Sequence, residues 1–240
     1  GVDNRLTVPK GWTEILSDSN LGFSAAAYRN TATGEIVIAY KGTDTLVKNA
    51  AVDWFAGNIP TGLLGIGSTQ LLDAALFYQA VKTANPNANI TFTGHSLGGG
   101  LASLMSVYFD KPATTFAEAP FLLTAFNPVV TGLLGASLAL NEIIDSDFAG
   151  FAANPLAIGL RSSNVHGYYV SGEILNYLRN PLTAICGQDS AITVGGVSLL
   201  PGSAVSNAIT LHSMNLTASL LMSQTFLNDT ISLPSLLSEI

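Results

Sequence analysis

Segments of two different hydrophobic periods follow one another along the chain. Short runs rich in β-branched and aromatic residues, typical of strands, lie at 23–29, 35–41, 90–93, 113–117 and 165–170. Apolar residues recur every three or four positions, as in helices, over 69–81, 97–108, 133–144, 151–160 and 211–224. Strands that alternate with helices predict an α/β fold with a central, mostly parallel sheet flanked by helices. No internal repeat or low-complexity linker is visible, so we expect residues 1–240 to form one domain.

Turn residues set the limits of several segments. Asn30 to Gly34 is typical of a hairpin loop between the first two strands, and Gly195-Gly196 of a two-residue hairpin turn. Ser68 or Thr69 can cap the first long helix, which Asn85-Pro86-Asn87 ends. These signals give the chain its expected order of elements from residue 23 onward.

Three stretches are less regular. Residues 1–20 contain Pro9 and Gly11 and predict an irregular lead-in, with Trp12 as a packing anchor. Asp53 to Phe55 is expected in a short helix. Residues 121–164 give little more than the two helical segments named above.

The segment Asn89 to Ala102 joins a strand to a helix through Gly94-His95-Ser96-Leu97-Gly98. A strand, a G-x-S-x-G turn and a helix form the nucleophile elbow of α/β-hydrolases, which exposes a serine hydroxyl above the sheet edge. The flanking glycines are needed because the turn is too tight for side chains. The helix N-terminus directs the amide of Leu97 at negative charge on a substrate oxygen. We therefore expect an α/β-hydrolase fold, with Ser96 as nucleophile and Leu97 as an oxyanion-hole donor.

A second oxyanion donor is expected from the loop that follows the strand 35–41. There the sequence Lys41-Gly42-Thr43-Asp44 places a glycine and a small hydroxyl residue at the carboxyl end of a strand. An elbow nucleophile needs a donor from such a loop, because Leu97 supplies only one. Taken alone the loop is an ordinary turn with an Asp cap, but upstream of an elbow it favours Thr43 as a donor.

A serine nucleophile needs a base, usually a histidine held by a carboxylate. The chain has three histidines. His95 adjoins Ser96, where neighbouring side chains diverge, so we expect it to pack or hydrogen-bond. His166 opens a strand and few carboxylates precede it. His212 follows every candidate acid, and the order serine, acid, histidine is that of this fold, so His212 is the expected base.

The acid must lie between Ser96 and His212. Glu173 follows a strand and a glycine, where an orienting carboxylate is normally placed, and it is the favoured acid. Asp145 and Asp147 lie in a stretch that resembles solvated helix or loop. They remain alternatives, as does Asp189.

Composition excludes several classes of protein. The chain has a net charge of −7 and no Lys/Arg cluster, which argues against nucleic acid as a partner. Cys186 is the single cysteine, so neither an intrachain disulfide nor a cysteine zinc cluster is possible. Only 10% of residues are charged and 48% are hydrophobic. Prolines interrupt the apolar run 119–141, which argues against a membrane-spanning helix. The balance favours, weakly, a secreted protein, and the polar start is consistent with a mature or excised portion of a longer one.

Four motifs together resemble the class 3, or fungal-type, lipase family. They are the strand end 39–44, the pair Asp53-Trp54, the elbow Gly94-His95-Ser96-Leu97-Gly98-Gly99, and the strand 115–120. The resemblance covers residues 23–120 well and the rest loosely. It implies an α/β-hydrolase that cleaves acylglycerol esters without metal or organic cofactor. It also implies Ser96 as nucleophile, Thr43 and Leu97 as oxyanion donors, and His212 as the C-terminal histidine.

This sequence departs from the family pattern at three points. Lys41 replaces the usual arginine, Glu118 interrupts a strand end of small residues, and the acid motif around Glu173 has Glu for Asp and lacks a proline. The last departure bears on the identity of the acid.

These observations predict a serine carboxylester hydrolase, first of all a lipase. Phospholipase A1 is the nearest alternative, feruloyl esterase a further one, and a non-catalytic lipid-binding protein on the same fold is the alternative from another class. The partner is a lipid or ester substrate at a lipid–water interface. Two apolar segments, Ile59–Gly67 and Val129–Leu140, are candidates for a mobile lid or for ordinary core.

Overall fold

The computed structural model describes residues 8–20, 23–42, 68–175, 188–193 and 204–222. A seven-stranded sheet runs through these residues, with its strands in the order of the sequence, β1 to β7. The strands are β1 (Trp12–Asn20), β2 (Phe23–Asn30), β3 (Ile36–Tyr40), β4 (Ile90–His95), β5 (Ala113–Phe116), β6 (Val165–Val170) and β7 (Gln188–Ile192). Strands β3 to β7 are parallel, and β1 and β2 are antiparallel. The prediction of a mostly parallel α/β sheet is confirmed.

The expected hairpin between the first two predicted strands is present as β2 and β3. The amide of Asn30 donates to the carbonyl of Glu35, and that of Gly34 to Asn30. The expectation of an irregular lead-in at 1–20 is wrong over Trp12–Asn20. These residues pair with β2 as an edge strand. An edge strand has one neighbour, and most of these side chains are exposed, so the strand lacks the apolar pattern that identifies buried ones.

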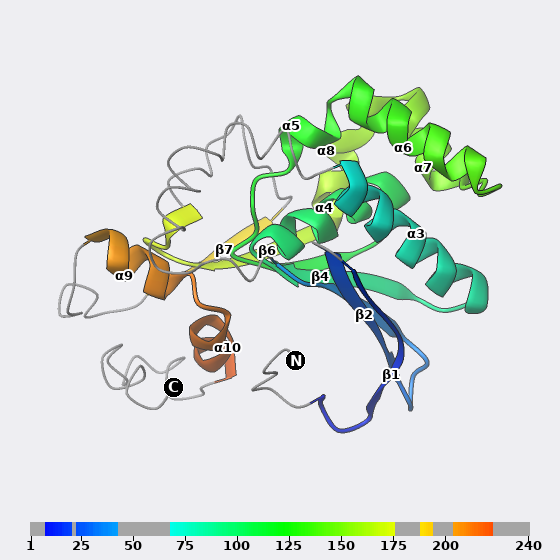
Figure 1. Cartoon of the computed structure of the whole chain (residues 1–240). Coiled ribbons are helices and arrows are strands. Elements are labelled where there is room, and N and C mark those ends of the chain that lie inside the picture. The colour runs from blue at the N-terminus through cyan, green and yellow to red at the C-terminus, as the bar shows by residue number, and fades with distance from the viewer. Residues whose placement is uncertain (1–7, 21–22, 43–67, 176–187, 194–203, 223–240) are drawn as a thin grey trace.

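The helices that connect the parallel strands lie on one face of the sheet, as Figure 1 shows. They are α3 (Ser68–Ala84), α4 (Leu97–Phe109), α5 (Leu122–Ala125), α6 (Pro128–Leu140), α7 (Ser146–Ala153) and α8 (Ile158–Arg161), with short 3-10 turns η2 (Pro155–Ala157) and η3 (Ser162–Asn164). Right-handed crossovers between sequential parallel strands place all the connecting helices on the same side. Helix α10 (Met214–Met222) lies on the other face, after α9 (Ala204–Leu211).

Helix α4 is the centre of the core. Every residue from Gly98 to Phe109 is buried, between the sheet below and the outer helices above. Aromatic rings from different elements meet there, including Tyr78 of α3 with Phe92 of β4 and Phe109 of α4. The helix that begins at the elbow is therefore held on all sides, which fixes the position of its N-terminus.

The outer helices α5 to α8 differ from the two helices predicted at 133–144 and 151–160. The first begins earlier, because Asn127 caps it by accepting hydrogen bonds from the amides of Val129 and Val130, with Pro128 as its first residue. The second is divided: α7, which Asp145 caps, ends at Ala153 before Pro155, and the short elements η2 and α8 cover residues 155–161. Both predicted boundaries are wrong because they rest on the spacing of apolar residues and ignore the capping residues Asn127 and Asp145.

The C-terminal helix predicted at 211–224 is also corrected. Helix α9 already covers 204–211, and α10 starts at Met214, so His212 and Ser213 form a turn between two helices. The sequence predicts His212 at a point where a loop meets a helix, and the structure places it in the turn between α9 and α10. The predictions for Thr43, Asp53 to Phe55, Ile59–Gly67 and Gly195-Gly196 concern residues outside the described ones. Among the helices described, none has the length and apolar character needed to cross a membrane.

Candidate active site

Ser96 lies in the turn between β4 and α4. Its backbone has φ 58° and ψ −124°, a conformation that side chains rarely adopt. The amide of Ser96 donates to the carbonyl of Phe116, while its own carbonyl accepts from Gly100 and Ala119. The surrounding strand and helix thus hold the strained residue in place, as an elbow requires.

Two glycines make this turn possible. A Cβ atom on Gly94 would lie 2.3 Å from the carbonyl oxygen of Gly98, and one on Gly98 would lie 2.1 Å from that of Tyr40. Neither backbone neighbour can move away, because both belong to regular elements. The glycines therefore allow the end of β3 and the start of α4 to approach the elbow closely.

His212 reaches Ser96 from the turn between α9 and α10. Its Nε2 atom is 2.9 Å from Oγ of Ser96, although the two residues are 116 positions apart in sequence. The histidine is only 2% exposed. This distance is within the range over which a base removes a proton from a hydroxyl.

Glu173 completes a line of three side chains. Its Oε2 atom lies 2.7 Å from Nδ1 of His212 and also accepts from the amide of Leu175 at 2.8 Å. Gly172, with φ 84°, forms the turn that follows β6 and brings the carboxylate to the carboxyl edge of the sheet. Glu173 is fully buried. The structure thus brings the favoured acid, the favoured base and the elbow serine together.

The alternative acids are engaged elsewhere. Asp145 is buried, which alone would raise its pKa, but hydrogen bonds from Gln79, Lys82 and the amide of Phe148, together with the Lys82 charge, lower it. The expectation that Asp145 is solvated is therefore wrong. Asp147 pairs with Lys111 at 3.3 Å. Asp189 lies on β7, opposite Gly167 of β6, and is exposed. No contact of these carboxylates with His212 is found among the described residues.

The oxyanion site is described in part. Leu97 is the first residue of α4, a position whose amide has no acceptor inside the helix. Gly42 follows β3, and a Cβ on it would lie 3.5 Å from Cβ of Ser96 and 2.8 Å from the carbonyl of His95. The chain therefore passes beside Ser96 at the residue before Thr43. The proposed second donor itself remains a prediction.

The two other histidines have different places. His166 is exposed on β6. His95 lies 2.7 Å, through Nε2, from the backbone carbonyl oxygen of His212. The sequence predicts that His95 packs or forms a hydrogen bond. It does not identify the partner, because the two residues are 117 positions apart.

Glu118, which departs from the family pattern of small residues at its strand end, is a buried carboxylate near the elbow. Glu118 is fully buried, and its Oε2 accepts from the hydroxyl of Thr115 at 3.2 Å. A Cβ atom on Gly99 would lie 2.6 Å from Cβ of Glu118, so the start of α4 packs directly on this residue. Glu118 therefore packs against the helix that begins at the elbow.

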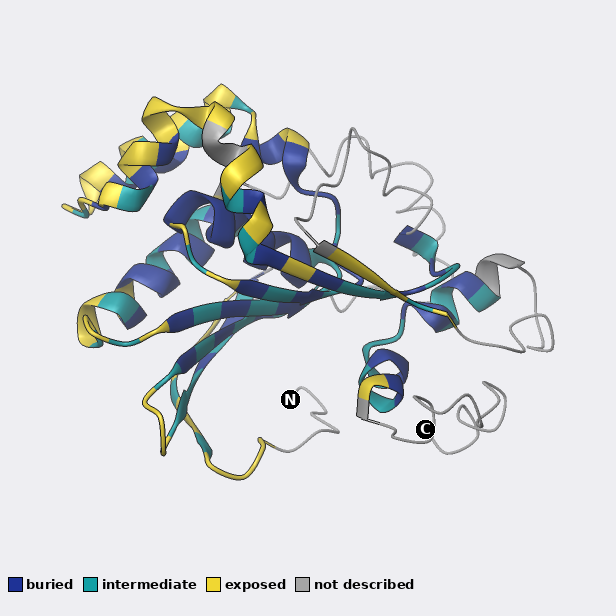
Figure 2. Ribbon diagram, turned by 180° about the vertical axis from the view of Figure 1, so that it is seen from behind, coloured by how far each residue is buried: buried dark blue, intermediate teal, exposed yellow. Residues whose placement is uncertain are grey.

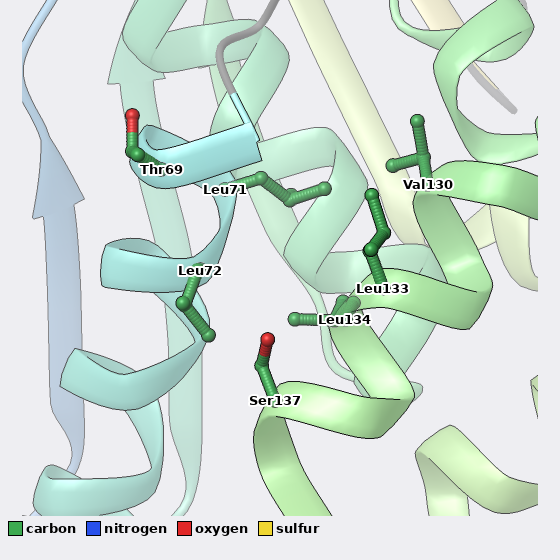
Figure 3. A pocket seen from close by; sticks show the side chains of 7 residues that line it. All are labelled: Thr69, Leu71, Leu72, Val130, Leu133, Leu134 and Ser137. Atoms are coloured by element: carbon green, nitrogen blue, oxygen red, sulfur yellow. The ribbon is translucent and has the colours of Figure 1, made fainter.

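An apolar groove lies between α3 and α6 (Figure 3). Its lining is Thr69, Leu71, Leu72, Val130, Leu133, Leu134 and Ser137, and its volume is about 160 Å³. Helix α6 contains the lid candidate Val129–Leu140. Its Leu134 and Leu138 are buried while Val129, Leu133 and Leu140 are exposed, so the segment is a helix with one packed side and one free apolar side.

A larger cavity lies on the opposite face of the sheet. Its volume is about 660 Å³, and its lining includes Trp12, Thr93, His95, Phe116 and Met214. The described residues contain no group of three or more His, Cys, Asp and Glu side chains that could hold a metal ion.

The parallel sheet, the elbow and the hydrogen-bonded Ser, His and Glu side chains define an α/β-hydrolase. The chain belongs to the family of phospholipase-like proteins described as the Tle-like phospholipase domain, which matches residues 4–232.

The curated proteins that the chain resembles include fungal ones. "Putative lipase ATG15" of Kluyveromyces lactis is 56% identical over 48 residues, which are 20% of this chain and 9% of that protein. The protein of the same name from Cryptococcus neoformans is 30% identical over 98 residues, 40% of this chain and 18% of that protein. The chain thus spans less than a fifth of the length of these relatives. The resemblance to fungal-type lipases is confirmed.

Solved structures of similar arrangement include a Rhizomucor miehei lipase in complex with its propeptide. It is 13% identical, with 85% of this chain and 65% of that chain covered and a TM-score of 0.43.

Proposed function

We propose that the protein hydrolyses carboxylic ester bonds of acyl lipids, with acylglycerols as the first substrate class. The observation that carries this proposal is the hydrogen-bonded line from Ser96 through His212 to Glu173, at 2.9 and 2.7 Å, on a nucleophile elbow. Membership in a phospholipase-like family supports a lipid as the acyl donor.

The reaction proceeds in two halves. Ser96 Oγ attacks the ester carbonyl carbon while Nε2 of His212 takes its proton, and Glu173 stabilises the imidazolium through Nδ1–H. The amide of Leu97, with that of Thr43, stabilises the oxyanion. The C–O bond then breaks, and His212 returns the proton to the departing alcohol. Water, activated by the same histidine, cleaves the acyl-serine and releases the fatty acid.

Phospholipids are the second candidate substrate class. The description of the matching family favours them, since it names a phospholipase domain. Glycerophospholipids carry the same acyl ester bond, so the same three residues serve either class. The difference must lie in how the head group is accommodated.

A substrate panel tests the proposal. Purified protein and Ser96→Ala are assayed on p-nitrophenyl esters, triolein and phosphatidylcholine, with fatty acid release as the readout. Hydrolysis by the wild type and only background release by Ser96→Ala are expected, because the substitution removes the hydroxyl and leaves the turn unchanged. The ratio of triolein to phosphatidylcholine hydrolysis decides the substrate class. Equal activity of the two proteins would sink the proposal, and no turnover by either would favour a non-catalytic lipid-binding protein.

A further inference from the structure

His95 is the elbow side chain that the proposed reaction leaves unused. Along β4 the side chains alternate between the two faces of the sheet, so that Phe92 is fully buried against Tyr78 of α3 while Thr93 and His95 line the cavity on the opposite face. Helix α10, which begins two residues after His212, lies on that face of the sheet (Figure 1), and its Met214 lines the same cavity. His95 is therefore directed at the turn that contains the base.

The contact between the two histidines has two parts. Nε2 of His95 is 2.7 Å from the backbone carbonyl oxygen of His212, and the two rings are 4.7 Å apart between centroids, tilted by 42°. A carbonyl oxygen only accepts, so Nε2 of His95 carries the proton and donates it. A short hydrogen bond and a ring contact thus join the elbow strand to the backbone of His212.

The carbonyl of His212 needs such a donor. The amide of His212 bonds back to the carbonyls of Ala208 and Ile209, at the end of α9, whereas its carbonyl lies past the last residue of that helix. Because His212 is 2% exposed, water is a poor substitute there. The bond from His95 satisfies this group and fixes the orientation of the peptide at the turn.

His212 is consequently held at both ends by consecutive residues. Ser96 contacts the Nε2 end of its ring at 2.9 Å, and His95 holds its backbone at 2.7 Å. Both come from one rigid strand–turn–helix unit, while Glu173 orients the ring from β6. Any movement of the turn at 212–213 relative to the elbow would lengthen the distance over which the proton is transferred.

We propose that His95 is a positioning residue that fixes the backbone of His212, so that its Nε2 stays in line with Ser96 during acyl transfer. The inference rests on the proposed function, because it concerns the rate of that reaction. The role proposed for His95 depends on its hydrogen bond to the backbone of His212, because the ring contact alone would not fix that backbone.

Two substitutions separate the hydrogen bond from the packing. His95→Phe keeps a ring beside His212 and loses the donor, and the cavity of about 660 Å³ beside it leaves room for the phenyl group. His95→Gln loses the ring but offers an amide N–H at nearly the position of Nε2. Thr93→Val lies on the same face of the same strand and serves as the matched control.

The measurements are kcat and KM on a soluble p-nitrophenyl ester, with the melting temperature of each variant. His95→Phe is expected to lower kcat by about 10- to 100-fold, because a small misplacement of a reacting group costs up to that much. Its KM should stay within about twofold, since substrate binding is not touched. His95→Gln should recover most of the lost kcat, and Thr93→Val should equal the wild type. The downfield proton resonance of the His212–Glu173 hydrogen bond should broaden in His95→Phe and return in His95→Gln.

Other outcomes overturn the assignment. Wild-type kcat in a folded His95→Phe, with Ser96→Ala inactive, refutes positioning and leaves the proposed function intact. Equal losses in His95→Phe and His95→Gln, with lowered melting temperatures, mean a packing role only. If His95→Phe does not fold, His95→Leu takes its place in the comparison with His95→Gln. An inactive wild type instead refutes the proposed function.

Discussion

The Oε2 atom of Glu173 lies 2.7 Å from Nδ1 of His212, on the side of the ring opposite Ser96. Glu173→Gln should therefore lower kcat by about 10⁴-fold, because the amide no longer selects the tautomer with the proton on Nδ1. The variant should unfold near the wild-type temperature, since Gln has the same shape.

Asp147→Asn and Asp189→Asn are the controls for this substitution. Asp147 is partly exposed and Asp189 is exposed, and both substitutions are expected to leave kcat within about tenfold of the wild type. A Glu173→Gln enzyme of near-normal rate, beside an inactive Asp147→Asn or Asp189→Asn, would move the acid to the sensitive position.

The same substitution at two glycines should have opposite effects. Gly98→Ala places a Cβ atom 2.1 Å from the carbonyl oxygen of Tyr40, and overpacking at such a contact costs about 1–3 kcal/mol or more. It should also abolish esterase activity by displacing Leu97 and Ser96.

Gly132→Ala in α6 is the matched control for Gly98→Ala. Apart from its chain neighbours and its own helix backbone, no heavy atom of the described residues lies within 4 Å of its would-be Cβ, and alanine is about 0.5–1 kcal/mol more favourable than glycine inside a helix. Urea unfolding and esterase rates of both variants check the pair. A stable and active Gly98→Ala would contradict the close approach of β3 and α4.

Asp145 should make stability depend on pH. Burial opposes its ionisation, but the hydrogen bonds from Gln79, Lys82 and Phe148 and the charge of Lys82 prevail, so its pKa in the folded protein is below the ordinary 3.8. A carboxylate with a lowered folded pKa stabilises fully above its unfolded pKa and loses that contribution as pH falls through the folded pKa. Asp145→Asn should therefore destabilise by about 1–3 kcal/mol at pH 7 and by less at pH 3.

Urea unfolding of both proteins between pH 7 and pH 3 measures this difference. The difference in the free energy of unfolding between wild type and Asp145→Asn should begin to decrease near pH 4. A gap that is constant over the whole range would mean that the ionised form of Asp145 has no special role.

The exposed apolar side chains of the outer helices should increase the rate of ester hydrolysis at a lipid–water interface. Figure 2 shows that much of these helices is exposed, and the exposed large apolar residues of the region include Val129 and Leu133 on α6 and Ile144 between α6 and α7. Contiguous exposed apolar side chains are typical of surfaces that meet a lipid or a partner. The double variant Val129→Ser and Leu133→Ser should lower hydrolysis of emulsified long-chain ester several-fold and leave the rate on a soluble short-chain ester unchanged.

Leu16→Ser on the edge strand β1 is the control, because Leu16 is also exposed but lies away from the outer helices. An equal loss of hydrolysis rate on soluble and emulsified substrate would contradict an interfacial role of α6. So would an equal loss of rate in Leu16→Ser.

Local patterns predicted the elements that contain Ser96 and the strand before Glu173, because each depends on neighbours in sequence. Glycines, a strand and a helix define the elbow within fourteen residues, and a strand end followed by Gly172 marks the acid. His212 followed from elimination and chain order. By contrast, the edge strand Trp12–Asn20 and the contact of His95 with His212 depend on pairing with distant segments, for which a single sequence contains no signal. The salt bridge of Asp145 with Lys82 was missed for the same reason.

The separation of Ser96 and His212 by 116 positions has a consequence for biosynthesis. A ribosome delivers the chain from its N-terminus, so the elbow serine is made well before the turn that supplies its base. In the proposed reaction His212 takes the proton of Ser96, so the serine lacks this base until the turn between α9 and α10 has been made. Hydrolysis by the proposed mechanism therefore cannot begin before the chain has been synthesised as far as His212.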